Sequence, residues 1–446
     1  MQRIPFSKTL TIGLMLFALF FGAGNLVFPA MMGQNAGDQF WQANLGFLIT
    51  GVGLPLLGTL ALGFSGSKNL LALINRVHPW FAFGFTTLLY LTIGPLFAMP
   101  RTGSVSYEIA VKPYIDAEHG TLAMAVFTVL FFAVTLLLSI NPAKMVDIVG
   151  KILTPILIVC IAVLAIVAIA APLGTPQEPG AGYASHAFFK GFQEGYLTMD
   201  ALAALVFGII VINAIQEKGI TERKSILAVC FQAALIAASM LAVIYTSLTY
   251  IGASSVSTFG ILANGGEVLT SVTNHYFGTF GGFVLGIIVL LACLTTSIGL
   301  TTACSSYVQK IIPGMSYKSI CIILSVISAL LANIGLDQLI QFSVPVLAII
   351  YPVAIVLILL TFLHDFFKGK RTVYGVSLLL TFLVSLVDGL KATPLNIEPI
   401  HDLFTQYLPL YGIGLGWLIP AIVGALIGLL LPGGHKGQQS SSLLED

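Results

Sequence analysis

Long apolar stretches with almost no charge recur from one end of the sequence to the other, and they limit what the chain can fold into. Of the 446 residues, 57% are hydrophobic and only 8% are charged. An ordinary soluble domain carries about 25% charged residues. Because so little charge cannot cover this much apolar surface in water, lipid must surround most of the chain. We therefore expect an all-α polytopic membrane protein.

The apolar stretches predict twelve transmembrane helices. A hydrocarbon core of about 30 Å needs roughly 20 apolar residues per helix. On that scale the spans are 9–34, 43–64, 79–110, 121–140, 150–172, 197–215, 225–252, 278–310, 318–334, 339–363, 372–389 and 409–431. We expect outer loops over 172–195 and 252–278, the second with room for a short surface helix.

The distribution of Lys and Arg predicts the orientation of these spans. Cytoplasmic loops of membrane proteins carry an excess of both residues. With the N-terminus in the cytoplasm, fifteen of the nineteen Lys and Arg fall on the inner side. The outer side, or the membrane itself, holds only Arg101, Lys112, Lys190 and Lys391. Adding or removing one span would destroy this asymmetry, so we expect both termini in the cytoplasm.

Several classes of protein do not fit the sequence. The net charge of +1 argues against a nucleic-acid partner, which attracts strongly basic faces. Neither HExxH nor GxxxxGK[ST] is present, which argues against a zinc protease and a P-loop ATPase. No Ser/His, paired-Asp or metal-ligand set falls deep in the spans, so we expect no enzyme and no organic cofactor. The charge rings and filter repeats of channels are also missing. Transport would then draw its energy from an ion gradient or from a partner.

The first span contains the segment Phe21-Gly22-Ala23-Gly24-Asn25. Each glycine weakens a helix by roughly 1 kcal/mol relative to alanine. An asparagine at mid-span is costly in lipid unless it has a partner. An unwound turn here would expose N–H groups that suit a carboxylate and C=O groups that suit an ammonium or a sodium ion. Close helix packing through small residues is the alternative, but packing alone does not require Asn25.

The sixth span contains a possible echo of the first. Ala18-Leu19-Phe20-Phe21-Gly22 is similar to Ala204-Leu205-Val206-Phe207-Gly208, five spans later. An odd displacement means that the two segments cross the bilayer in opposite directions. Paired, glycine-interrupted spans of opposite direction are typical of inverted-repeat transporters. A chance match in sequence this rich in Leu, Phe and Ala is the alternative.

Hydroxyl residues gather in the eighth span, at Thr295-Thr296-Ser297. Thr295 and Thr296 would act as neutral oxygen ligands for a hard monovalent cation, together with the carbonyls of Ala292, Ala18 and Phe21. The equally good alternative is that each hydroxyl bonds back to a carbonyl of its own helix.

Three ionisable residues at membrane depth are candidates for a gate, because such positions are usually functional. They are Arg101, Glu108 and Asp200. Arg101 would pair with one of the two carboxylates and close the outer side. The alternative is that all three reach the headgroup region and are solvated. Pro95 and Pro100 interrupt the backbone hydrogen bonding of the same span.

With these residues in view, the chain resembles the bacterial branched-chain amino acid:cation symporters, the BrnQ-type family. The similarity extends essentially from end to end. Its most specific segments are Phe17–Pro29 (FALFFGAGNLVFP), Gly94–Thr102 (GPLFAMPRT), Tyr196–Gly208 (YLTMDALAALVFG) and Ala292–Leu300 (ACLTTSIGL).

The resemblance implies a symporter of the bacterial cytoplasmic membrane that imports leucine, isoleucine and valine with sodium as coupling ion. It also implies the five-plus-five inverted repeat of leucine transporters. Residues 1–175 and 176–365 would form the two repeats, and 366–446 two further helices and a cytoplasmic tail. Proton coupling through Glu108 or Asp200 is the rival within transport. The small substrate and the lipid bilayer are the expected partners, and no oligomeric state is predicted.

The resemblance also implies two sets of site residues. The sodium ligands would be Ala18, Phe21, Ala292, Thr295 and Thr296. The residues at the substrate's backbone groups would be Gly22, Ala23, Gly24 and Asn25 with the turn Phe207, Gly208 and Ile209. The apolar wall for a branched side chain would come from Phe20, Phe21, Phe207, Ile209 and Val211.

Overall fold

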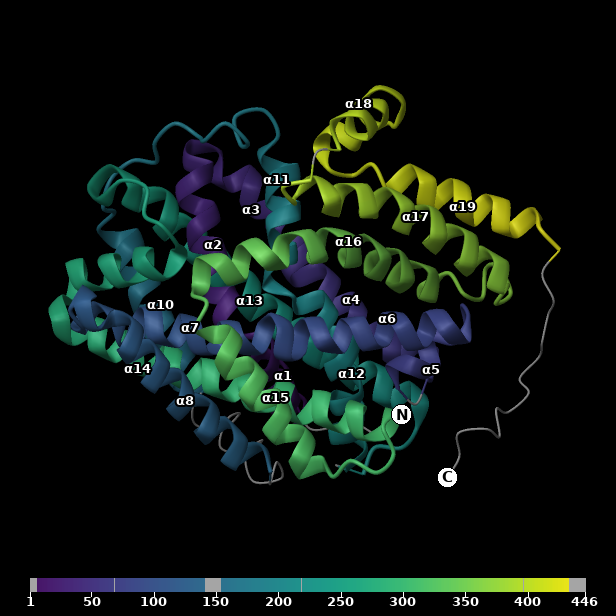
Figure 1. Ribbon diagram of the computed structural model, residues 1–446, viewed down its shortest axis with the longest axis horizontal. Coiled ribbons are helices and arrows are strands. Elements are labelled where there is room, and N and C mark those ends of the chain that lie inside the picture. Colours follow the sequence, from purple (N-terminus) through teal and green to yellow (C-terminus); the bar gives the residue numbers. More distant parts are fainter. Residues whose placement is uncertain (1–5, 68, 141–153, 218, 396, 433–446) are drawn as a thin grey trace.

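Helices make up nearly all of the regular structure in the computed structural model, which describes residues 6–67, 69–140, 154–217, 219–395 and 397–432 (Figure 1). Within these ranges there is no β-strand, which confirms the all-α prediction. The start of the predicted fifth span (150–153) and the tail from residue 433 lie outside the described residues.

The elements follow one another along the chain as short and long helices. The first half contains α1 (Phe6–Phe20), α2 (Ala23–Ala36), α3 (Phe40–Leu48), α4 (Leu54–Ser65), α5 (Leu70–Ile74), α6 (Pro79–Leu91), α7 (Ala98–Ala110), α8 (Gly120–Ser139) and α10 (Thr154–Ala170). The second half contains α11 (Ala187–Glu194), α12 (Asp200–Glu217), α13 (Arg223–Phe259), α14 (Gly265–Ile311), α15 (Tyr317–Ala332), α16 (Leu336–Phe362), α17 (Arg371–Lys391), α18 (Glu398–Tyr407) and α19 (Leu418–Leu430).

Eight helical segments of the described chain are long and apolar enough to cross a membrane, and four shorter apolar helices accompany them. The count of twelve spans therefore stays a prediction, as does the three-part division of the chain. The two predicted loops are wrong in part. Residues 172–195 contain α11, and α13 continues to Phe259. The helix that begins at Gly265 is broken at Gly278 (φ 65°, ψ −168°), so the short helix expected within 252–278 is present.

The first span is broken where its glycines predicted a break. α1 ends at Phe20 and α2 begins at Ala23, so Phe21 and Gly22 alone join them. Gly22 is the N-cap of α2 in an extended conformation (φ −125°, ψ −160°). The unwound interpretation of this segment is confirmed, and the alternative of simple close packing is wrong.

A second break precedes α12. The chain leaves α11, makes a short 3-10 turn over Gly195–Thr198, and passes through Met199 in the left-handed region (φ 62°) before α12 begins at Asp200. Few residues other than glycine take this conformation, and a bulky one there stores strain. The sixth span is thus interrupted, but several residues earlier than the predicted Phe207-Gly208-Ile209 turn.

A third interruption lies between α6 and α7. Thr92–Leu96 forms a π-helical turn in which Gly94 leaves the helical region (φ −91°, ψ −123°), just before Pro95. A proline cannot donate the helical hydrogen bond and clashes with the preceding turn. Pro100 falls in the first turn of α7, where a missing N–H costs little. Pro95 therefore makes the predicted interruption, and Pro100 does not.

Glycines let several helices cross at backbone contact. A Cβ placed on Gly252 of α13 would collide with the carbonyl oxygen of Ala30 on α2. One placed on Gly33 of α2 would collide with the carbonyl oxygen of Thr249 on α13. Small residues of this kind dominate helix interfaces in membranes, because lipid gives no hydrophobic drive for helices to associate.

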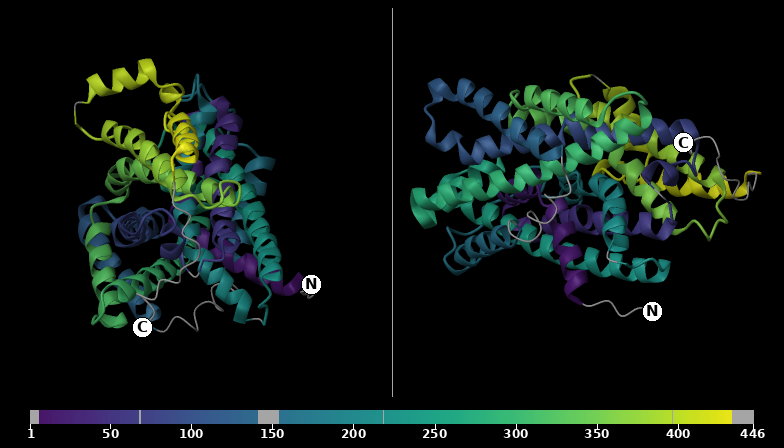
Figure 2. Two further views of the ribbon diagram at one scale, coloured as in Figure 1. Left: turned by 90° about the vertical axis from the view of Figure 1, so that its right-hand side faces the viewer. Right: turned by 90° about the horizontal axis from the view of Figure 1, so that it is seen from below.

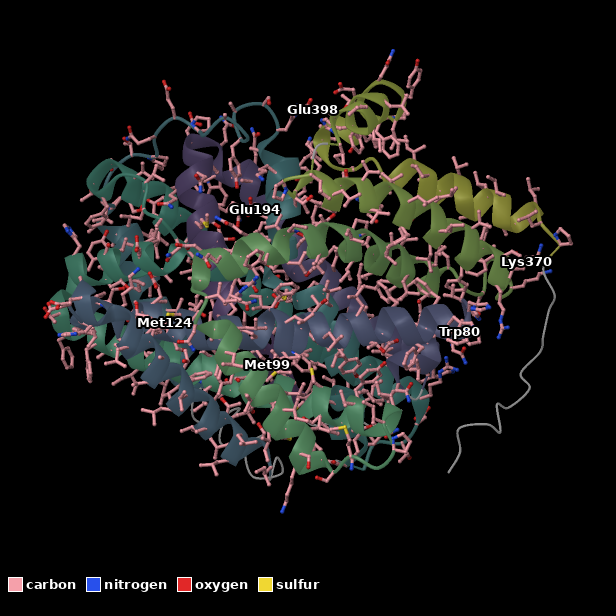
Figure 3. The ribbon with its side chains drawn as sticks, viewed as in Figure 1. Trp80, Met99, Met124, Glu194, Lys370 and Glu398 are labelled. Atoms are coloured by element: carbon pink, nitrogen blue, oxygen red, sulfur yellow. The ribbon has the colours of Figure 1, made fainter. Side chains whose placement is uncertain are left out.

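Loops predicted on the same side of the membrane lie together. Trp80 at the start of α6 and Lys370 before α17 are at the same end of the bundle (Figure 3). At that end Arg76 donates to the carbonyl of Ser65 (2.7 Å), and Arg223 donates to that of Phe64 (2.8 Å). These segments therefore lie at one end of the bundle, while the side of the membrane that this end faces stays a prediction.

The C-terminal helices form a layer beside the rest. α17 packs against both α16 and α19 (Figure 1). α18 projects from the bundle in both Figure 1 and the left view of Figure 2, and none of its residues is buried.

Candidate functional site

A cavity lies where the two broken helices meet. The breaks that precede α2 and α12 open onto it, and α7 and α14 complete it. Its lining residues are Leu19, Phe20, Gly22, Ala23, Gly24, Asn25, Ile93, Ala98, Arg101, Thr102, Thr198, Met199, Asp200, Ala203, Phe207, Thr296 and Leu300. All four predicted residues of the first break, Gly22 to Asn25, are among them.

Asn25 joins the two breaks through a buried hydrogen-bond network. Its Nδ2 donates to Asp200 Oδ2 (2.6 Å) and to the hydroxyl of Tyr245 on α13. The Tyr245 hydroxyl in turn donates to the same oxygen of Asp200 (2.7 Å). All three side chains are at most 2% exposed. Buried polar groups of this kind fix one arrangement, because leaving any of them unpaired is costly.

Asn25 also holds the first break open. The backbone N–H of Gly22 donates to Asn25 Oδ1 (2.9 Å). In a continuous helix that N–H would donate to the carbonyl of Ala18, four residues earlier. The Ala18 carbonyl is thereby released from its usual helical partner at the end of α1. One asparagine therefore supplies both an acceptor for the backbone N–H of the N-cap residue Gly22 and the release of a carbonyl oxygen.

Oxygen atoms of α1 and α14 gather beside this break. Thr295 and Thr296 both donate to the carbonyl of Ala292 (2.7 and 3.2 Å), and Thr296 Oγ1 also reaches the carbonyl of Phe21 (3.5 Å). A Cβ on Gly22 would lie 3.0 Å from the Thr296 side chain, so only glycine leaves this approach unstrained. The back-bonding that the sequence left as an alternative is present. It coexists with the contact between α14 and the first break.

The described residues contain no group of three or more His, Cys, Asp or Glu that could hold a metal ion. The oxygen atoms gathered beside the first break are carbonyl and hydroxyl oxygens. Four of the five predicted ligands, Phe21, Ala292, Thr295 and Thr296, are linked by the hydrogen bonds above, and Ala18 lies one turn before Phe21.

The predicted substrate turn in the sixth span is wrong in position. Gly208 and Ile209 lie inside the continuous helix α12 and do not line the cavity. A Cβ on Gly208 would meet Leu62 at 3.0 Å, so this glycine serves packing against α4. Phe207 does line the cavity.

Arg101 is buried in the site and makes neither of the predicted pairs. It is 2% exposed and donates to the carbonyl of Leu197 (2.6 Å) and the hydroxyl of Ser343 (2.9 Å). Its guanidinium carbon lies 4.9 Å from the centre of the Phe28 ring. Among the described residues, neither Glu108 nor Asp200 forms an ion pair with it. The solvated alternative is also wrong for Arg101 and for Asp200, which is equally buried.

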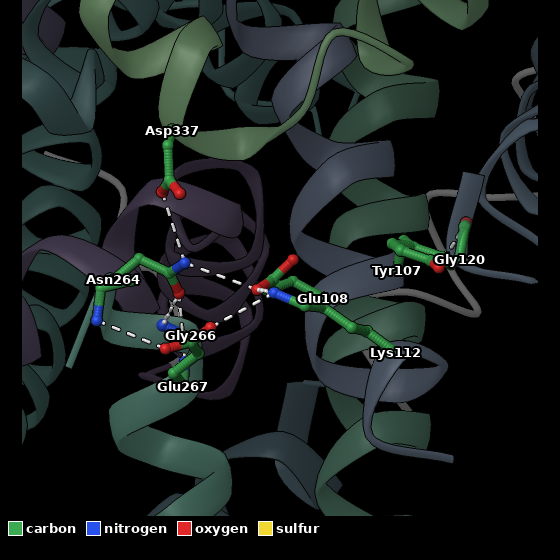
Figure 4. Close-up of polar contacts among 9 residues, drawn as sticks. Tyr107, Glu108, Lys112, Gly120, Asn264, Gly266, Glu267 and Asp337 are labelled. Atoms are coloured by element: carbon green, nitrogen blue, oxygen red, sulfur yellow. Dashed lines mark hydrogen bonds and ion pairs between the residues drawn. The ribbon is translucent and has the colours of Figure 1, made fainter. Parts of the chain in front are cut away.

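Glu108 belongs to a separate cluster near the predicted outer surface (Figure 4). It pairs with Lys112, which also pairs with Glu267 at 3.2 Å. Asn264 donates toward Glu108 (3.5 Å) and Asp337 (3.3 Å), so the cluster ties α7 to the starts of α14 and α16. Glu108 does not line the cavity.

The cavity also has an apolar wall. Phe20 and Phe207 approach with ring centres 6.5 Å apart, and Leu19, Ile93 and Leu300 extend the same surface. Phe21 instead stacks on Phe17 (5.1 Å), and neither it nor Ile209 and Val211 lines the cavity. Two of the five predicted wall residues are therefore in place.

Several residues of the site escaped the sequence analysis. They are Tyr245, Thr198, Met199 and Ser343. Thr198 and Met199 fall within Tyr196–Gly208 and directly precede Asp200 in the sequence. An ionisable residue at this position was the feature from which the second break could have been predicted. Tyr245 and Ser343 lie in long apolar helices where a single polar residue gives no such signal.

Comparisons with known proteins agree with this architecture. Residues 6–433 match the family described as "Branched-chain amino acid transport protein". The chain is 57% identical over 430 residues to the branched-chain amino acid permease BrnQ of Bacillus subtilis, covering 96% of this chain and 98% of that one. It is 41% identical over 421 residues to the branched-chain amino acid transport system 2 carrier protein of Pseudomonas aeruginosa, covering 94% and 95%.

Solved structures show the same fold at low sequence identity. A nucleobase-cation-symport-1 family transporter with bound bromovinylhydantoin has a TM-score of 0.60 and 14% identity, covering 95% of this chain and 91% of that one. MhsT in complex with L-phenylalanine has a TM-score of 0.53 and 17% identity, covering 94% and 97%. These structures establish the fold, which is of the leucine-transporter type. The family match shows that the chain is a membrane transporter and not an enzyme. The chain belongs to the branched-chain amino acid transport protein family.

Proposed function

We propose that this transporter imports leucine, isoleucine and valine together with sodium by alternating access. The observation that carries the proposal is the position of the Phe21 carbonyl. It lies within reach of Thr296 on one side and is adjacent in sequence to Gly22, which lines the cavity. A cation that binds these oxygens would stabilise the same geometry of the break that receives the substrate. Such shared stabilisation is what couples two ligands.

The apolar wall favours branched-chain substrates. Phe20 and Phe207 face a space bounded by further aliphatic side chains. One methylene in such a pocket is worth only about 1–3 kcal/mol. Leucine, isoleucine and valine should therefore compete with one another, whereas charged side chains would be excluded by the cost of desolvation.

Proton coupling is the second candidate, because Asp200 is a buried carboxylate that lines the cavity. Uptake of labelled leucine into proteoliposomes separates the two. Sodium coupling requires uptake under a sodium gradient at equal pH on both sides. Uptake under a pH gradient in sodium-free buffer, with none under the sodium gradient, would establish the proton instead. Both forms of the proposal place the protein in the bacterial cytoplasmic membrane with both termini inside.

Replacing Thr296 with valine should raise the sodium concentration for half-maximal leucine uptake by at least about tenfold. Valine keeps the shape but removes the hydroxyl oxygen, and one ligand or charged hydrogen bond is worth about 1.5–3 kcal/mol. Thr301→Val is the matched control. Its hydroxyl bonds to Ser297 of the same helix (2.7 Å) and does not line the cavity. An unchanged sodium dependence in Thr296→Val would exclude this cation site.

Replacing Phe207 with alanine should remove part of the apolar wall and enlarge the cavity. We expect the apparent affinity for leucine to fall about tenfold or more, since a buried aromatic side chain contributes several kcal/mol of contact. The amino acid phenylalanine should then compete with labelled valine more effectively in the variant than it does in the original protein. Competition of both amino acids against labelled valine measures the change, with alanine as an internal reference. Equal loss for all competitors would show that Phe207 does not determine side-chain selectivity.

A further inference from the structure

Two opposite charges line the same cavity without pairing with each other. Arg101 comes from α7 and Asp200 from the start of α12, and each is 2% exposed. A buried charge without a counter-charge costs several kcal/mol, and ionisable residues are rare within membranes for this reason. The cavity therefore holds one cation and one anion whose charges a ligand could balance.

Arg101 retains hydrogen-bond donors for such a ligand. A guanidinium has five N–H groups in a planar fork. Nη1 and Nη2 donate one hydrogen bond each, to Leu197 and Ser343, whereas the buried Nε has no partner among the residues that the structure describes. These two acceptors are neutral, so they occupy some of the guanidinium N–H groups but do not compensate its positive charge. The remaining donors match the geometry of a carboxylate, which arginine binds through two parallel hydrogen bonds.

The guanidinium also lies beside the start of α2. Nη1 of Arg101 is 2.6 Å from the Leu197 carbonyl oxygen. That oxygen would lie only 3.5 Å from a Cβ on Gly24. The first N–H groups of a helix carry partial positive charge and attract anions. An anion at this place would meet the helix terminus and Arg101 together.

Asp200 is positioned for the opposite charge. Asn25 and Tyr245 both donate to its Oδ2. These two donors fix the plane of the carboxylate, and its other oxygen has lone pairs for an incoming donor. An ammonium carries three donors and no acceptor, so it fits a carboxylate held in this way.

We propose that Arg101 binds the α-carboxylate and Asp200 the α-ammonium of the transported amino acid. The assignment rests on the proposed function and deepens it, because it names the charged groups that recognise the substrate. A zwitterion carries one charge of each sign on two groups bound to the same carbon, so it supplies a counter-charge to both residues at once and keeps the cavity neutral. A ligand with only one of its two charges leaves one residue unpaired, which discriminates strongly against it.

Competition with two leucine analogues tests the assignment. The first, 3-methylbutylamine, lacks the carboxylate, and the second, 4-methylpentanoate, lacks the amino group. Binding of labelled leucine to the purified full-length protein is measured by scintillation proximity, in sodium buffer and at acidic pH. The original protein should bind leucine at least about 100-fold more tightly than either analogue. An analogue that binds within tenfold of leucine overturns the assignment even without any variant.

The variants then assign each charge. Arg101→Gln should weaken leucine about 100-fold while leaving the amine unchanged or slightly tighter, since the repulsive cation is gone. Asp200→Asn should weaken leucine to a similar degree while leaving 4-methylpentanoate unchanged or tighter. Arg101→Lys, which keeps the charge without the fork, should show the pattern of Arg101→Gln with a smaller loss. Equal weakening of all three ligands would indicate a purely structural role and overturn the assignment.

Matched controls make the same chemical changes elsewhere. Arg223→Gln removes an arginine at the start of α13, and Asp388→Asn removes a carboxylate within α17. Neither residue lines the cavity, so both variants should retain leucine affinity within about twofold. Size-exclusion profiles establish that each variant is folded. If the original protein binds no leucine in either buffer, the proposed function and this assignment both fall. If it binds leucine but the analogue pattern is absent, only the assignment falls.

Discussion

Replacing Asn25 with alanine should abolish leucine uptake, lowering the initial rate at least about 100-fold, without preventing the protein from folding. The side chain accepts from the Gly22 backbone and donates to Asp200 and Tyr245. Its loss leaves a buried backbone N–H and a buried carboxylate with fewer partners. Each unsatisfied group costs about 1–3 kcal/mol, and more when it is charged. A loss of this size is enough to lower the population of the transport-competent geometry of the first break by tenfold or more.

The measurement is the initial rate of labelled leucine uptake by proteoliposomes, normalised to the amount of reconstituted protein. Asn35→Ala is the matched control, because Asn35 lies at the other end of α2 and its side chain donates within that helix, to the carbonyl of Met31 (2.8 Å). The control should transport at near the original rate. Original rates in Asn25→Ala would show that the network is dispensable.

The second large effect concerns stability. Gly252→Ala should lower the free energy of unfolding by about 3 kcal/mol or more, because the added methyl group would overlap the Ala30 carbonyl oxygen. Overpacking usually costs about 1–3 kcal/mol when side chains can move aside. Here the obstacle is the backbone of α2, so one helix must move away from the other. Gly33, on the facing helix, makes the reciprocal contact with Thr249.

Thermal unfolding in detergent, followed by size exclusion or intrinsic fluorescence, measures this change. Gly375→Ala is the control, since a Cβ on that glycine of α17 meets nothing within 4 Å. Its melting temperature should stay equal or rise slightly, because alanine favours a helix over glycine by about 1 kcal/mol. If both variants melt at the same temperature, the close crossing of α2 and α13 is not required.

The sequence predicted the first break more accurately than the second for a physical reason. Gly22 and Gly24 flank an asparagine that lipid would not accept without a partner, so the pattern itself indicated an unwound segment. The second break is marked by Met199, whose left-handed conformation no propensity predicts. Gly208 misled because a lone glycine in a membrane helix serves close packing as readily as unwinding.

Pairing of distant side chains was the harder part of the site. Arg101 and Asp200 stood out in the sequence as ionisable residues at membrane depth, but their partners depend on how α7, α12 and α16 fold together. The separation of Glu108 from Arg101 illustrates the point. Glu108 lies seven residues later on the same helix, yet it joins Lys112 and Glu267 instead. Sequence spacing along one helix cannot show which neighbouring helix each side chain faces.

The glycine crossing of α2 with α13 has a thermal consequence. Contacts between two backbones gain their energy from van der Waals attraction, which is enthalpic, whereas burial of apolar surface from water weakens on cooling. Helices that associate within lipid release little water, so this crossing should contribute little heat-capacity change. The packing of α2, the helix that carries Asn25 in the cavity wall, should therefore stay stable at low temperature. Hydrophobic contacts in soluble proteins, in contrast, weaken on cooling.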